Sequence, residues 1–136
     1  MVRKHFTQMS VDEKGYLSRK IDKAMLRYST HNNKRMKDRE ICDSDIEQTI
    51  RNFEIINFRM ESLTSQSATI RSRRKINGNY IHLVIGIPDG KIITCYKHPY
   101  PDDRADLDMN YNEKLDIRNL VKSNTKLRTG YFKGRR

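Results

Sequence analysis

Alternating apolar residues between positions 54 and 97 are the feature that most limits the fold of this chain. After Phe53 the spacing of apolar side chains changes from a helical period near 3.6 to a period of 2, which is typical of β-strands. The alternation occupies four segments, 54–60, 67–76, 79–87 and 91–97. An Asn-Gly pair at 77–78 and a Pro-Asp-Gly run at 88–90 are turn signals between successive segments. The sequence therefore predicts a meander of four antiparallel strands.

The first fifty residues have the spacing of helices instead. An apolar stripe predicts a helix over 11–27, and Asp12 is a candidate cap for its start. A second helix is expected to open at Ser29 or Thr30. In the stretch 42–53, Ser44 followed by Glu47 matches a capping box and predicts a third helix. The predicted fold class is α+β, with N-terminal helices followed by a four-stranded antiparallel sheet and a basic C-terminal extension.

The length of 136 residues fits one domain with a modest core. We expect residues 1–12 to be a flexible basic arm, 13–97 to be the α+β domain, and 98–136 to be an extension. A short helix over 113–121 is expected within that extension. The last nineteen residues, 118–136, hold seven Lys or Arg and no Asp or Glu, so they are predicted to be a basic arm.

A net charge of +11 is the strongest global indication of function. Such a surplus repels itself in the compact state and favours binding to a polyanion, most commonly a nucleic acid. The mean hydropathy of −0.90 leaves no room for a spanning segment, and residues 1–10 lack the apolar run of a secretory signal. The two cysteines form no CxxC pair and the histidines show no metal spacing. We therefore expect a soluble, cytoplasmic protein without membrane contact, metal or other cofactor.

The segment 70–75 carries the densest run of cations. On a strand, Arg71, Arg73 and Lys75 would share one face at a spacing of about 7 Å, and Arg74 would face the other way. That spacing is close to the phosphate repeat of an extended nucleic-acid strand, and a solvated sheet face is the alternative. Further nucleic-acid contacts are expected from the basic tail through Lys126, Arg128 and Lys133.

Two other groups of residues are candidates for chemistry. In the second helix His31, Arg35 and Arg39 recur every four positions and would share one face. The histidine could act as general base or acid while the arginines stabilise charge on a phosphorane, and the alternative is a wet helix face.

The other group lies on the last two strands. Tyr80 and His82 share one strand face, as do Thr94 and Tyr96 on the neighbouring strand. If these faces coincide, the sheet presents a surface for stacking and hydrogen bonding to RNA, with His82 as a second acid or base. Ordinary cross-strand pairing is the alternative.

Five short motifs, in this order, resemble the RelE-like domains. They are His31-x3-Arg35-Met36-x2-Arg39-x-Ile41, Ser44-Asp45-x-Glu47-x2-Ile50, Arg73-x-Lys75, Tyr80-x-His82-x-Val84-x-Gly86 and Gly90-Lys91-Ile92-Ile93-Thr94-x-Tyr96. The group is similar to the bacterial ribonuclease toxins that include barnase, EndoU, colicin-type tRNases and RelE. The likeness covers residues 30–97.

The resemblance implies metal-independent cleavage of RNA by attack of the 2′-hydroxyl on the adjacent phosphate. Its catalytic positions would fall on His31, Arg35, Arg39, Thr94 and Tyr96, and its central basic strand on Arg73 and Lys75. The expected partners are RNA (tRNA, mRNA or the ribosome) and an acidic antitoxin or immunity protein, since opposite charge steers association. The alternative is a non-catalytic nucleic-acid-binding or protein-interaction regulator, of phage or plasmid type, on the same fold.

Overall fold

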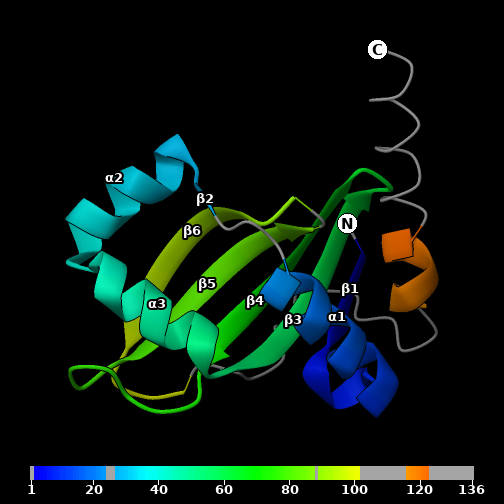
Figure 1. The fold of residues 1–136 in the computed structure, drawn as a ribbon, viewed down its shortest axis with the longest axis horizontal. Coiled ribbons are helices and arrows are strands. Elements are labelled where there is room, and N and C mark those ends of the chain that lie inside the picture. Colours follow the sequence, from blue (N-terminus) through cyan, green and yellow to red (C-terminus); the bar gives the residue numbers. More distant parts are fainter. Residues whose placement is uncertain (1, 24–26, 88, 102–115, 123–136) are drawn as a thin grey trace.

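A six-stranded mixed sheet forms the centre of the protein in the computed structural model, which describes residues 2–23, 27–87, 89–101 and 116–122. Four strands follow one another in antiparallel order: β3 (Phe53–Ser62), β4 (Ser65–Ser72), β5 (Tyr80–Ile87) and β6 (Lys91–His98). Two short strands extend this meander. β1 (Val2–His5) pairs antiparallel with β3, and β2 (Arg27–Tyr28) pairs parallel with β6. The resulting order is β1-β3-β4-β5-β6-β2 (Figure 1).

The α+β class is therefore correct, but the predicted four-stranded antiparallel sheet is wrong because both of its edges carry a further strand. The expectation of a loose arm over 1–12 is also wrong, since residues 2–5 form β1. The apolar pattern misses β1 because its buried side chains are Arg3, Lys4 and His5. Strand β2 is two residues long, too short to show any period.

Three α-helices precede the meander: α1 (Val11–Lys23), α2 (Thr30–Arg39) and α3 (Asp43–Arg51). The hydroxyl of Ser29 accepts a hydrogen bond from the N–H of Asn32, so the predicted start of α2 is confirmed. The other two predicted caps are wrong by a few residues. Ser10 exchanges hydrogen bonds with Glu13 at the start of α1, where Asp12 was expected.

At the start of α3 the carboxylate of Asp45 accepts from the N–H of Cys42, in place of the Ser44 and Glu47 pair. The short 3-10 helix η1 (Phe6–Gln8) connects β1 to α1.

The core lies between one face of the sheet and helices α1 and α3, which cover that face in Figure 1. Leu17 and Ile21 of α1 and Ile46 of α3 are almost fully buried against the sheet. The sheet side chains of this core alternate along β4 and β5, and irregularities in the pairing of β3 and β6 shift the alternation there. They include Phe58, Ile70, Leu83, Ile85 and Cys95. Alternation places the other face of β5 and β6, with His82 and Tyr96, on the side away from these helices.

A further helix at 117–122, inside the predicted extension, packs on the same core through Ile117 and Val121. The compact domain therefore does not end at residue 97. The basic tail, with Lys126, Arg128 and Lys133, lies outside the described residues. Among the helices that the structure describes, none has the length and apolar character needed to cross a membrane.

Candidate functional site

Helix α2 lies along the outer edge of β6. Strand β2 pairs with only Lys91 and Ile92, so the later carbonyls of β6 are available to side chains. The hydroxyl of Ser29 donates to the carbonyl of Ile93 at 2.9 Å, and Arg39 Nη1 donates to the carbonyl of Cys95 at 2.6 Å. These two bonds anchor both ends of α2 and hold Arg39 beside the last residues of β6.

A surface cavity of about 570 Å³ opens at this point. Its lining residues are Arg39, Tyr96, Lys97 and His98. Lys97 Nζ donates to the carbonyl of Glu40 at 3.2 Å, so both cations are held by backbone carbonyls and neither lies in an ion pair with a carboxylate among the described residues. A carbonyl carries a dipole and no net charge, so the cavity keeps the positive charge of both side chains.

An aromatic cluster forms the wall of this cavity. The rings of His82 and Tyr96 stack with centroids 4.6 Å apart and planes 10° from parallel. His98 meets Tyr96 edge-on at 5.6 Å. The two strand faces coincide at this pair, because His82 lies directly opposite Tyr96. His82 is fully buried, so it can orient Tyr96 but cannot itself contact a substrate.

Of the residues predicted to be catalytic, Arg39 and Tyr96 line this cavity, and His82 lies behind Tyr96. His31 and Arg35 are in contact, with Arg35 Nε donating to His31 Nε2 at 3.3 Å, but neither lines the cavity. Thr94 lies on the Tyr96 face, opposite Val84, and also stays outside the lining. The predicted row along α2 therefore divides into an exposed pair and a separate arginine that is fixed to β6.

Two cavity residues, Lys97 and His98, were missed from the sequence. The predicted strand stopped at residue 97, whereas β6 continues to His98. Extending the alternation of Thr94 and Tyr96 by one step would have placed His98 on the same face.

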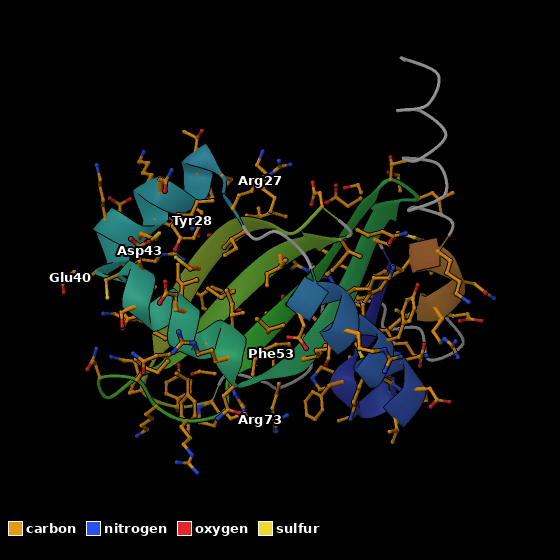
Figure 2. The ribbon with its side chains drawn as sticks, viewed as in Figure 1. Arg27, Tyr28, Glu40, Asp43, Phe53 and Arg73 are labelled. Atoms are coloured by element: carbon orange, nitrogen blue, oxygen red, sulfur yellow. The ribbon has the colours of Figure 1, made fainter. Side chains whose placement is uncertain are left out.

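The predicted cation ladder on β4 is wrong because the strand ends at Ser72. Arg71 is buried, lies over the ring of Tyr80 at 5.3 Å, and pairs with Glu54 at 3.2 Å. Arg73 lies beyond the strand (Figure 2). It pairs with the same carboxylate at 2.8 Å. Both arginines thus share the one carboxylate of Glu54, and the buried Arg71 has almost no surface to offer a phosphate.

The rest of the run, Arg74 and Lys75, contributes to a second basic cavity of about 290 Å³. Its lining residues are Gln48, Arg51, Asn52, Ser72, Arg74, Lys75 and Ile76. None of its three cations has an ion pair within the described part of the chain. Both basic cavities lie toward one end of the sheet, because β4 ends at Ser72, β5 begins at Tyr80, and Tyr80 pairs with His98.

A third hollow, of about 460 Å³, lies between β2 and α3 and is more apolar. At its side the hydroxyl of Tyr28 donates to Asp43 Oδ1 at 2.7 Å (Figure 2). Burial, and then the Asp43 carboxylate, raise the pKa of Tyr28 far above its usual value. The phenol stays protonated and ties β2 to α3, which is a structural role.

The two cysteines are both free, and only Cys42 is exposed. Burial raises the pKa of the Cys95 thiol, with Arg39 opposing the shift in part. A buried, protonated thiol is a poor nucleophile, so Cys95 belongs to the core.

The chain belongs to the family described as "Domain of unknown function (DUF4258)", whose profile matches residues 28–97. The matched region runs from β2 almost to the end of β6 and includes Arg39, Tyr96, Lys97 and the whole second basic cavity. No curated protein and no solved structure matches the chain.

Proposed function

We propose that this protein is an endoribonuclease of bacterial toxin type that cleaves RNA by attack of the substrate's own 2′-hydroxyl. The observation that carries the proposal is the cavity at the edge of β6. It combines the imidazole of His98 and the phenol of Tyr96 with two cations, Arg39 and Lys97. Neither cation forms an ion pair with a carboxylate of the described residues. These are the groups that phosphodiester cleavage requires, namely proton carriers and stabilisation of a charged phosphorane.

Arg39 and Lys97 would hold the scissile phosphate. The 2′-oxygen forms a bond to phosphorus and gives up its proton, while the bond from phosphorus to the 5′-oxygen breaks and that oxygen takes up a proton. The products are a 2′,3′-cyclic phosphate and a 5′-hydroxyl. The guanidinium of Arg39 stabilises the negative charge that builds on the phosphoryl oxygens between these steps.

His98 is the proposed proton carrier. An imidazole both accepts and donates protons near neutral pH, and His98 is the half-buried imidazole in the cavity lining. The phenol of Tyr96 would donate a hydrogen bond to the phosphate or carry the second proton. His82 is a positioning residue, because its stacked ring fixes the plane of Tyr96.

The second basic cavity supports RNA as the ligand. Arg51, Arg74 and Lys75 would bind backbone phosphates away from the scissile bond, which adds affinity without reading sequence. An acidic antitoxin or immunity protein would inhibit the enzyme by covering the same cations.

A non-catalytic nucleic-acid-binding protein is the second candidate. It is favoured by one observation. Among the described residues, five cations line the two basic cavities, but a single histidine does. A binder of this kind needs the cations but not the imidazole.

The test is incubation of purified protein with tRNA and with total RNA in EDTA, followed by analysis of the fragment ends. We expect discrete fragments with 5′-hydroxyl ends from the wild type and from His31→Ala, whose side chain lies outside the cavity. His98→Ala should reduce the rate by about 10²–10⁴-fold, the usual contribution of general acid or base catalysis.

Intact RNA in every reaction, together with a salt-dependent gel shift, would leave the binding protein as the function. Loss of cleavage in His31→Ala with full activity in His98→Ala would instead move the proposed chemistry to the outer face of α2.

A further inference from the structure

Tyr100 ends the aromatic cluster beside the β6 cavity and differs from the other rings in its exposure. Its ring stacks on His98 with centroids 5.3 Å apart and planes 16° from parallel. Even so, 55% of the residue is exposed, which leaves the ring accessible on the side away from His98. A large exposed aromatic residue that is already stacked on one face offers a ready surface to a second flat ring.

Neighbouring prolines restrict the backbone that carries this ring. Pro99 and Pro101 flank Tyr100 directly. Each fixes its own φ, and Pro101 also restricts the backbone of Tyr100 before it. A ring that is stacked on His98 and carried by such a backbone loses less entropy on binding, so the surface is preorganised.

The other tyrosines of this sheet face, Tyr80 and Tyr96, are only half-exposed. Tyr80 lies under the guanidinium of Arg71, and Tyr96 is stacked against His82. Tyr100 is two residues beyond His98, which lines the cavity with its two cations. The rings of Tyr100 and His98 would therefore lie between a flat group on Tyr100 and an anion in the cavity.

We infer that Tyr100 is a stacking site for one unpaired nucleobase of the RNA whose phosphate occupies the β6 cavity. Bases in a duplex are stacked on their neighbours and cannot offer a free face, so the substrate is single-stranded at this position. The inference rests on the nucleic-acid ligand of the proposed function. It adds the strandedness of the substrate and a residue outside the family match, which ends at residue 97.

The experiment measures binding of the full chain to an octamer of 2′-O-methyl RNA with one 2-aminopurine near its centre. The 2′-O-methyl groups block cleavage, and fluorescence quenching of 2-aminopurine reports stacking. The same octamer annealed to its complement serves as the duplex probe. The variants are Tyr100→Ala and the matched control Tyr100→Phe, which keeps the ring.

Wild type and Tyr100→Phe are expected to bind the single strand more tightly than the duplex and to quench its fluorescence. Tyr100→Ala should lose the quenching and bind the single strand about 5- to 150-fold more weakly, the usual effect of removing one stacked base. Its affinity for the duplex should be unchanged.

Equal binding and equal quenching by Tyr100→Ala and wild type would overturn the inference. So would equal wild-type affinity for single strand and duplex. These outcomes are independent of catalysis, because the probe cannot be cleaved. If the wild type does not cleave RNA but Tyr100→Ala still loses the quenching, the ribonuclease proposal fails and the stacking site stands. If the wild type binds neither probe, both proposals fail.

Discussion

Lys4 and Arg39 lie at opposite edges of the same sheet, and their surroundings differ in one respect. The side chain of Lys4 on β1 is only 5% exposed, and its Nζ donates to both carboxylate oxygens of Glu13, at 2.8 and 2.9 Å. Glu13 also accepts from the N–H groups of Ser10 and Ile117. Arg39, beside β6, donates to the carbonyl of Cys95 and meets no carboxylate among the described residues.

The difference separates charge that maintains the fold from charge that is available to a ligand. The Lys4–Glu13 pair is neutral overall, and the Glu13 carboxylate joins β1, α1 and the helix at 117–122. Around the β6 cavity no described carboxylate cancels the charges of Arg39 and Lys97. A buried ion pair is costly to break, whereas a half-buried cation without a carboxylate can be removed at a smaller cost in stability.

The largest expected effect comes from breaking the Lys4–Glu13 pair. Glu13→Gln removes the charge of Glu13 from beside the buried ammonium of Lys4 and should lower the free energy of unfolding by about 3–5 kcal/mol. Urea denaturation followed by circular dichroism measures the change. Glu47→Gln, on the exposed side of α3, is the control and should change stability by no more than about 0.5 kcal/mol. Equal stabilities for the two variants would contradict a structural role for the pair.

Acid should remove part of the stability that the Glu13 carboxylate contributes. Burial alone would raise the pKa of Glu13, but the hydrogen bonds from Lys4, Ser10 and Ile117 outweigh it and hold the pKa below its usual 4.5. A lowered carboxyl pKa contributes stability that is present above the unfolded value and is lost as the pH falls through the folded value. The stability difference between wild type and Glu13→Gln should therefore be constant above about pH 5 and shrink below pH 4.5. A stability difference that grows on acidification would contradict the lowered pKa of Glu13.

Charge removal from the second basic cavity should affect binding and leave the fold unchanged. Arg74→Ala or Lys75→Ala should weaken RNA binding and reduce the slope of log K against log salt by about 0.7 for each phosphate that the variant no longer neutralises. The control is Arg73→Ala, in the same segment between β4 and β5, because Arg73 is paired with Glu54. Fluorescence anisotropy over a salt series measures the slopes. Equal reductions in all three variants would show that net charge alone matters.

The smallest effect is expected for the ion pair on the outer face of α2. Arg35 Nη1 and Asp38 Oδ2 are 3.8 Å apart and both side chains are more than a third exposed. Asp38→Asn should change stability by less than about 1 kcal/mol, because water screens such pairs. Thermal unfolding measures the change, and a destabilisation as large as that from Glu13→Gln would remove the contrast between exposed and buried pairs.

The meander and the start of α2 could be predicted from the sequence because each has a local cause. Period-2 alternation defines β3 to β6, and Ser29 caps its own helix. Strand β1 could not be predicted in this way. Its buried cations resemble a solvated arm, and Glu13, which pairs with Lys4, is nine residues away in another element.

The candidate site was predictable only in part for a related reason. Helical spacing groups His31, Arg35 and Arg39, but the bond from Arg39 to Cys95 spans 56 residues and removes Arg39 from that row. Glu54 similarly takes Arg71 and Arg73 out of the predicted phosphate ladder from another strand. The sequence reveals where the cations are, and the tertiary contacts determine which of them are already paired with a carboxylate.

The most direct test of this distinction compares Arg39→Gln with Arg35→Gln in one pair of measurements, RNA cleavage rate and free energy of unfolding. Both changes remove one positive charge from α2, and glutamine at position 39 keeps an N–H donor for the carbonyl of Cys95. Arg39→Gln is expected to slow cleavage by about 10²–10³-fold, the cost of removing one charge-stabilising donor. Its stability should stay within about 1 kcal/mol of wild type, and Arg35→Gln should leave both quantities nearly unchanged. Unfolding of Arg39→Gln, or equal cleavage rates in the two variants, would contradict the assignment of Arg39 to the substrate.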